Sequence, residues 1–142
     1  MKLSPNFKLS EFVKSDTASL NGIDNTPNED EISNLTRVAY TLEIIRLVMG
    51  APVRISSGYR CLELNRIIGS ADTSKHVEGL AVDFTVKGYT PKESVDIIRR
   101  VVGFNTLIQE FGRWVHLDLD SDLDNNVLLA LNINGETHYT EI

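Results

Sequence analysis

The sequence predicts an α+β fold with a mostly antiparallel sheet and helices packed on one of its sides. Two segments carry apolar residues at helical spacing, each behind a capping pattern. Short segments with alternating or apolar character cluster later in the chain, and an Asn-Gly pair near its end marks a β-hairpin. Because long helices come first and strands gather afterwards, the pattern is typical of α+β proteins.

Length and composition favour one folded domain over residues 1–142. A chain of 142 residues buries roughly 70% of the surface that its unfolded form exposes. It contains one cysteine and three histidines, which excludes an internal disulfide. The formal net charge of −6 argues against a general nucleic-acid or anionic-membrane binder, because such proteins carry a basic surface.

No targeting or membrane-spanning segment is visible. Residues 1–6 lack the apolar run of a signal peptide, and no stretch approaches the roughly 18 apolar residues of a membrane helix. We therefore expect cytoplasmic synthesis without membrane insertion. If the substrate lies outside the cell, another agent must deliver the protein.

The first long helix is marked at both ends. Thr26-Pro27-Asn28-Glu29 has the form of a capping box with Pro27 at the first helical position, and Gly50 closes the segment. Apolar residues recur between these ends at the spacing of one helix face. The expected core positions are Ile32, Leu35, Val38, Ala39, Leu42, Ile45 and Met49.

The second helix repeats this signal from Thr90 and Pro91, and we expect it to end at Gly103. Its expected core positions are Val95, Ile98, Val101 and Val102. Residues 14–30 are polar and are expected to form a surface loop. Shorter helices are expected over residues 10–13 and 62–68.

Strands fill the remainder of the chain. In residues 81–86, Val82 and Phe84 share one face while Asp83 and Thr85 share the other. A carboxylate at position 83 therefore points away from the core. The expected strands are residues 53–56, 81–86, 106–110, 114–119, 127–133 and 137–140.

The stretch over residues 74–83, Ser-Lys-His-Val-Glu-Gly-Leu-Ala-Val-Asp, carries the most specific chemistry. His76 and Asp83 stand seven positions apart with Gly79 between them, where the chain can turn. Farther on, His116 and Trp114 share a strand face. If the two strands are neighbours, His76, Asp83 and His116 converge into a set that suits catalytic zinc, with a position left for water. The spacing alone also fits packed or solvated side chains.

Together these residues resemble the zinc D-Ala-D-Ala carboxypeptidases and related phage endolysin peptidases, which share the hedgehog-type zinc peptidase fold. The resemblance rests on Ser-x-His-x-x-Gly-x-Ala-x-Asp over residues 74–83 and Trp-x-His over residues 114–116. Ser-Gly-Tyr-Arg over residues 57–60 and Leu-Ser-Glu-Phe over residues 9–12 also resemble family segments. The likeness covers residues 3 to about 119.

The resemblance implies that His76, Asp83 and His116 bind Zn²⁺. It places Arg60 near the substrate, where an always-charged guanidinium would stabilise a carboxylate or a developing oxyanion. A surface salt bridge is the structural alternative for Arg60.

Two further residues are expected at the substrate. Ser74 would shape the site through a hydrogen bond, with a turn-forming serine as the alternative. Trp114 would wall the cleft, with a core tryptophan as the alternative.

The general base departs from part of the family pattern. Several relatives place an acidic residue three positions before the last histidine ligand, but Arg113 stands there in this chain. Glu110, six positions before His116, resembles the arrangement of the hedgehog-like branch. A tight connection over residues 111–113 would fold it back beside His116, and we expect Glu110 to be the base. Asp118, on the same strand face as His116, stays open as the alternative.

Three other features favour structural or solvated roles. His138 is expected on the surface, although a role as a fourth ligand stays open. Cys61 has no CxxC partner and is expected to be a buried free thiol. The aspartates that alternate from Asp118 to Asp124 lack the glycine and glutamate of an EF-hand and are expected to form a solvated acidic loop.

The resemblance implies a zinc metallopeptidase that hydrolyses peptidoglycan stem peptides, as a D-Ala-D-Ala carboxypeptidase or an endopeptidase. The sequence does not choose between these two. The alternative, motivated by Arg113, is a zinc-stabilised, non-catalytic peptidoglycan-binding or virion structural module. With no export signal, a phage or prophage endolysin fits, acting on the cell wall once a separate permeabilising partner gives access. We expect a monomer with no nucleic-acid partner.

Overall fold

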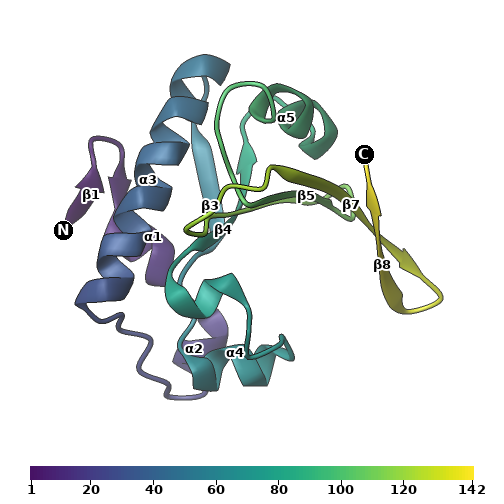
Figure 1. The fold of residues 1–142 in the computed structure, drawn as a ribbon. Coiled ribbons are helices and arrows are strands. Elements are labelled where there is room, and N and C mark those ends of the chain that lie inside the picture. The colour runs from purple at the N-terminus through teal and green to yellow at the C-terminus, as the bar shows by residue number, and fades with distance from the viewer.

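The chain folds around a six-stranded mixed sheet with the two longest helices packed on one face, while two shorter helices lie at one end of it (Figure 1). The computed structural model describes residues 1–142. The strand order is β3-β4-β6-β5-β7-β8, and β1 and β2 form a separate pair. The strands are β1 (Lys2–Ser4), β2 (Phe7–Lys8), β3 (Val53–Ser57), β4 (Ala81–Val86), β5 (Thr106–Glu110), β6 (Trp114–Asp118), β7 (Asn126–Ile133) and β8 (Glu136–Glu141). The helices are α1 (Leu9–Val13), α2 (Asp16–Leu20), α3 (Glu29–Met49), α4 (Leu62–Ile68), α5 (Pro91–Ile98) and the 3₁₀ helix η1 (Lys75–Glu78).

Neighbouring strands of the large sheet run antiparallel, except that β5 and β7 are parallel. The exception follows from where β6 ends. Asp118 lies opposite Thr106, so β6 finishes beside the start of β5, and residues 119–125 bring β7 in at the same edge of the sheet. The predicted α+β class with a mostly antiparallel sheet is confirmed.

The apolar face of the sheet packs against α3 and α5 and forms one core. The predicted alternation of β4 is confirmed, because Val82, Phe84 and Val86 are all buried. Six of the seven predicted core residues of α3 are buried, and Ile32 is partly buried. Each such large side chain stabilises the fold by roughly 1.5–3 kcal/mol. The opposite face of the sheet, which carries Asp83, is left for polar groups.

Helix α3 begins two residues later than the sequence predicted. Asn28 caps it, since its side chain accepts from the Glu31 N–H at 2.8 Å while the Glu31 carboxylate accepts from the Asn28 N–H at 2.8 Å. The Thr26 hydroxyl instead donates to Asp24 at 2.6 Å. Pro27 is therefore not the first helical residue, because the contact with Asp24 removes Thr26 as a cap.

Helix α5 begins as predicted and ends early. Thr90 caps it in a reciprocal pair with Glu93, and Pro91 stands in the first turn. The helix stops at Ile98, and the chain then tightens into a turn in which the Val101 N–H donates to the Ile98 carbonyl. The predicted end at Gly103 is wrong, since Val101 is 37% exposed and offers no core contact that would prolong the helix.

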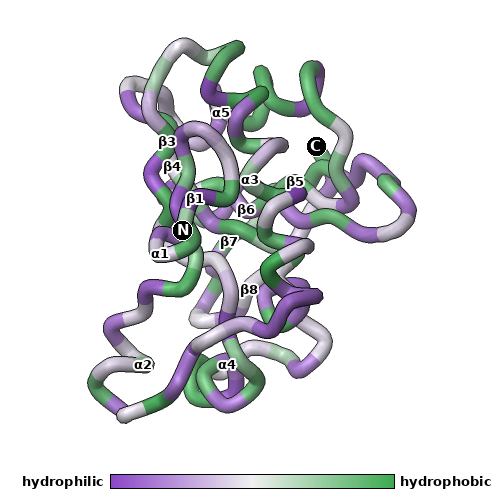
Figure 2. Tube along the Cα trace, turned by 90° about the vertical axis from the view of Figure 1, so that its left-hand side faces the viewer, coloured by the Kyte–Doolittle hydropathy of each residue, from purple (hydrophilic) through white to green (hydrophobic).

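Residues 14–30 are not only a loop, since they contain α2. Ser15 accepts a hydrogen bond from the Ala18 N–H at 3.1 Å and caps this short helix. Ala18 alone is buried there, so the sequence showed no apolar periodicity. Figure 2 shows α2 at the end of the molecule away from α5, in a segment of mixed hydropathy. None of the helices combines the length and the apolar character that a membrane crossing requires.

Candidate active site

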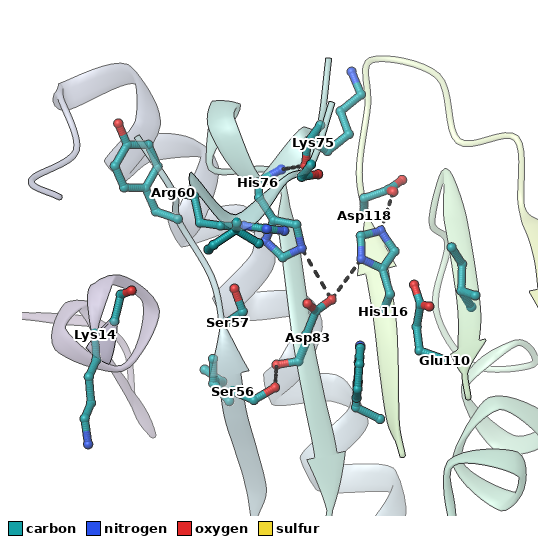
Figure 3. Close-up of a pocket in the computed structure, with 18 of the residues that line it drawn as sticks. Lys14, Ser56, Ser57, Arg60, Lys75, His76, Asp83, Glu110, His116 and Asp118 are labelled. Carbon is teal, nitrogen blue, oxygen red and sulfur yellow. Dashed lines mark hydrogen bonds and ion pairs between the residues drawn. The ribbon is translucent and has the colours of Figure 1, made fainter. Parts of the chain in front are cut away.

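The polar face of the sheet brings together the three predicted ligands (Figure 3). Asp83 on β4 lies opposite His116 on β6, and His76 reaches the same point from η1. Asp83 Oδ1 is 3.3 Å from His76 Nε2 and 2.9 Å from His116 Nδ1. One ligand atom from each residue lies within 4.8 Å of the others. The convergence expected from neighbouring strands is confirmed.

The ring of His76 is held from its far side. His76 Nδ1 lies 2.6 Å from the carbonyl oxygen of Gly58. Because a carbonyl only accepts, Nδ1 carries the proton, which leaves the lone pair of Nε2 toward Asp83. Ser74 accepts from the backbone N–H of His76 at 3.3 Å, so its hydroxyl caps η1 in the turn-forming role that was the alternative for this residue, while the residue also lines the cleft.

Two glycines allow this loop to approach its supports. A Cβ on Gly58 would lie 2.5 Å from the Phe12 carbonyl oxygen. A Cβ on Gly79 would lie 2.7 Å from the Glu31 carbonyl oxygen, and the φ of Gly79 is 73°. A side chain at either position would push the loop away from its supports, and with it His76 or the Gly58 carbonyl that orients the His76 ring.

His116 is bonded through both ring nitrogens. Its Nε2 lies 2.7 Å from Asp118 Oδ2, on the side of the ring away from Asp83. Asp118 is buried, and its other oxygen accepts from Asn105 Nδ2 at 3.2 Å and from the Thr106 N–H at 3.1 Å. Asp118 is therefore not part of a solvated acidic loop as the sequence suggested, because these donors enclose it.

The charges in this group reinforce one another. Burial opposes a charged imidazole, but hydrogen bonds to Asp118 and Asp83 outweigh it and raise the pKa of His116 to about 10. Burial also opposes the charge on Asp83, yet the hydrogen bond from His116, with a further contribution from the nearby His76 ring, holds the pKa of that carboxyl well below its usual range. Asp83 is thus a carboxylate at neutral pH, the form that binds a metal.

The donor set fits zinc. Two imidazole nitrogens and one carboxylate oxygen are ligands that zinc accepts, and a set of three leaves a position for water or substrate. The outward-facing nitrogens of both rings are occupied by Gly58 and Asp118. Such partners orient histidine ligands and fix which nitrogen meets the metal.

Glu110 stands beside this group through the turn between β5 and β6. The Arg113 N–H donates to the Glu110 carbonyl at 2.9 Å, and the register places Glu110 opposite Trp114. Trp114 is two positions before His116 on the same face, so Glu110 folds back toward the ligands as expected. Burial raises the pKa of Glu110, His116 lowers it and Asp83 raises it, with a net rise.

Arg60 lies between β3 and α4, on the other side of Asp83. Its backbone N–H donates to the His76 carbonyl at 3.1 Å. Burial lowers the pKa of the guanidinium, and the charge of Asp83 opposes that shift. The Nε of Arg60 is buried without a hydrogen-bond partner. Arg60 therefore does not form the surface salt bridge that was its structural alternative. Its Nε–H is available to donate to a bound substrate.

All seven predicted site residues line one cleft of about 1400 Å³. Trp114 is half-buried and packs edge-on against Phe111 at a ring distance of 5.7 Å, so it forms part of the wall. The cleft runs on to Tyr139 of β8. Arg113 also lines the cleft, at the turn that carries Glu110.

The remaining predictions concern groups outside the ligand set. His138 is exposed, 3.9 Å from the Glu136 carboxylate, and the metal-binding group does not include it. Cys61 is a free, half-buried thiol. Beyond Asp118 the acidic run is mostly exposed, with Asp120 paired to Lys75 at 3.0 Å.

Sequence reasoning missed three contributors to the site. Gly58 stands in the segment over residues 57–60 that resembles the family, so the sequence singled out this segment. The sequence did not indicate that the Gly58 carbonyl orients the His76 ring. No sequence pattern indicated Asn105 or Tyr139. Asn105 contacts Asp118 from a loop, and Tyr139 reaches the cleft only because of the order of the strands in the sheet. Tyr139 is found from the strand register, and Gly58 and Asn105 are found from hydrogen bonds between residues far apart in the sequence.

Comparison with known proteins agrees with this geometry. A family model described as Peptidase M15 matches residues 5–118, which include every predicted site residue. Peptidases of that family are zinc-dependent, and the match confirms the resemblance drawn from the two motifs. No curated protein matches the chain.

Proposed function

Because the chain belongs to the M15 peptidase family, whose members are zinc metallopeptidases, we propose that it hydrolyses stem peptides of peptidoglycan. The observation that carries the proposal is the convergence of His76, Asp83 and His116 with Glu110 on one face of the cleft. The substrate class is supported by the likeness of the motif pair to D-Ala-D-Ala carboxypeptidases and endolysin peptidases.

The proposed ligands are His76 through Nε2, Asp83, and His116 through Nδ1. Zinc bound there would acidify a water molecule and polarise the carbonyl of the scissile bond. The Gly58 carbonyl accepts a hydrogen bond from His76 Nδ1–H, and Asp118 accepts one from His116 Nε2–H. These two bonds keep the ring protons on the nitrogens that face away from the metal. Metal binding would displace the proton on His116 Nδ1, and both rings would then present a lone pair to the same side.

Asp118 is proposed as a positioning residue and not as the base. Oδ2 is engaged by His116, and Oδ1 by Asn105 and the Thr106 N–H. Because both oxygens have partners and the residue is buried, Asp118 is less suited than Glu110 to take a proton from a water molecule at the carbonyl. Its carboxylate also stabilises the ring orientation that metal binding needs.

Glu110 is proposed as the general base and acid. It takes a proton from the attacking water as the carbon–oxygen bond forms, and gives it to the leaving nitrogen as the carbon–nitrogen bond breaks. Burial raises its pKa, which brings its proton affinity closer to the value that transfer near neutral pH requires. Arg60 would hold negative charge on the carbonyl oxygen or on a substrate carboxylate, using its free donor.

The decisive experiment is digestion of purified peptidoglycan by the zinc-loaded protein, with fragments identified by mass spectrometry. We expect new amino and carboxyl termini within stem peptides, and none after thorough chelation. The masses also show whether one terminal residue or a longer piece is released. Undiminished hydrolysis by the chelated protein would overturn the proposal.

A non-catalytic zinc-stabilised module is the second candidate. It is favoured by Arg113, which replaces the acidic residue that several relatives carry three positions before the last histidine. Such a module would bind zinc and stem peptides without releasing fragments. Calorimetric binding of a stem peptide, measured beside the digestion, separates the two candidates.

An endolysin-like role in a phage or prophage is proposed from the motif resemblance, as is action on the wall after a separate partner permeabilises the membrane. The net charge of −6 supports the absence of a nucleic-acid partner. Expression in bacteria with and without a permeabilising protein tests the role, since lysis is expected only with both.

A further inference from the structure

The hairpin of β7 and β8 lies outside the family match and still reaches the cleft. It spans residues 126–141, whereas the match ends at residue 118. Every residue of β8 is exposed, and Figure 1 shows the hairpin projecting from the body of the sheet. Tyr139 nevertheless lines the same cleft as the metal-binding group.

The strand register places Tyr139 in line with Glu110. Glu110 pairs with Trp114 on β6 and with Ala130 on β7, and Ala130 pairs with Tyr139. Paired residues point to the same face of a sheet, so all four stand on the face of the cleft. Neighbouring strands are about 4.8 Å apart, which places the Tyr139 backbone roughly 10 Å from that of Glu110.

Ala130 stands between Glu110 and Tyr139 in the strand pairing. It is fully buried although it stands on the cleft face of a strand near the sheet edge. Burial and the charge of Glu110 raise the pKa of Tyr139. The strand pairing places the phenol and the carboxylate on the same face with one small residue, Ala130, between them.

The position of Glu110 indicates where the leaving amine of the substrate lies. An acid that protonates the leaving amine must lie within hydrogen-bond reach of it. The substrate residue with that amine therefore lies toward β5, and a peptide that continued in this direction would pass over β7 and reach Tyr139 on β8. An extended peptide advances about 3.5 Å per residue, so the distance to Tyr139 corresponds to roughly three residues.

We propose that Tyr139 is a specificity-determining residue that contacts the substrate beyond the first residue on the leaving-amine side. The hairpin would then favour extended or cross-linked stem peptides over peptides that end one residue after the scissile bond. The phenol offers an apolar ring face and one O–H donor for a peptide carbonyl or carboxylate. This inference rests on the proposed peptidase function.

The test uses two stem peptides that share the scissile bond and differ only in carrying one or four residues after it. We expect Tyr139→Ala to lower kcat/KM for the longer peptide roughly five- to tenfold, as loss of one aromatic contact would. For the shorter peptide we expect less than about a twofold change, since it ends before Tyr139. Thr140→Ala, next along β8 on the opposite face, is the matched control and should change neither. Tyr139→Phe separates the ring from the hydroxyl.

Each result decides the proposal. Equal losses on both peptides, or a wild type without preference for the longer one, would overturn the role of Tyr139 and leave the peptidase function intact. Hydrolysis of neither peptide by the zinc-loaded wild type would overturn the peptidase function, and the subsite with it. Matching thermal unfolding of Tyr139→Ala and Thr140→Ala shows that both variants are folded.

Discussion

The strands β3, β4, β6 and β5 differ from the hairpin of β7 and β8 in how they are supported. The former are covered by α3 and α5, and their inward side chains, such as Phe84 and Leu117, are fully buried. In the hairpin, Leu131 and Ile133 are 43% and 48% exposed. Of the predicted ligands, Asp83 and His116 stand on the covered strands and His76 on η1, whereas Tyr139 is the one cleft residue that stands on the hairpin. The predicted ligands, which need fixed geometry, thus stand where packing holds the backbone. The exposed hairpin carries only the proposed substrate contact, so changes in it could alter substrate preference without moving the ligands.

The largest effect should come from removing a ligand on the covered strands. His116→Ala leaves two ligands and should lose zinc and at least about 1000-fold of the hydrolysis rate, which depends on the metal. Zinc content after dialysis and fragment release measure both. His138→Ala removes an exposed histidine of the hairpin and should leave both unchanged. A comparable loss in the two variants would break the contrast between the regions.

The free energy of unfolding should depend more on the covered strands than on the hairpin. Phe84→Ala opens a cavity under the covered strands and should lower the free energy of unfolding by about 3–5 kcal/mol. Leu131→Ala removes a half-exposed side chain and should cost less than about 1 kcal/mol. Chemical denaturation measures both. Equal costs would show that the hairpin is as tightly packed as the rest of the sheet.

Glu110→Gln should lower the hydrolysis rate by roughly 100-fold or more, because it removes the base. Zinc content should not change, which separates the effect from that of His116→Ala. Unchanged hydrolysis and an unchanged pH profile would show that Glu110 is not the base.

The same residue links rate and stability to pH. Only the carboxylate form of Glu110 accepts a proton, so the rate should fall as pH falls through its raised pKa. A folded-state pKa above the unfolded one contributes stability at low pH that is lost as pH rises through it. At neutral pH the Glu110→Gln variant should therefore unfold at the same or a higher temperature than the wild type, measured by calorimetry.

The smallest of these effects is expected at Asp118. Asp118→Asn keeps the size of the side chain but weakens the bond to His116 Nε2, and should lower zinc affinity roughly tenfold. Competition with a chromophoric chelator measures the affinity. Asp120→Asn, on the exposed run two positions on, is the control and should bind zinc as the wild type does.

Most of the fold was predictable because its signals are local. Thr90 and Glu93 mark the start of α5, and Asn134 with Gly135 forms the expected turn, with φ values of 55° and 84°. The start of α3 was not predictable, because Thr26 and Asn28 are both suitable capping residues. The hydrogen bond from Thr26 to Asp24 engages Thr26 and leaves Asn28 as the cap. The parallel pairing of β7 with β5 has no sequence signal, since it follows from where β6 ends.

The candidate site divides in the same way. His76 and Asp83 were found from their motif, and Glu110 from the turn that follows it. Asp118 looked solvated because it begins a run of alternating aspartates. Its burial depends on Asn105, which lies 13 positions away and arrives from a different loop. The sequence around Asp118 and around Asn105 contains no pattern that predicts this contact.

The turn between β5 and β6 has a consequence for aligning distant sequences. Glu110 reaches the ligands across a strand pair, so the interval of six from Glu110 to His116 counts the turn over residues 111–113 and the start of β6, and not a distance in space. An insertion at Gly112 would lengthen that interval and leave the pairing of Glu110 with Trp114 intact. Alignments that require a fixed interval would then lose the acidic residue, whereas strand pairing would recover it. A designer could likewise change this turn without moving the carboxylate.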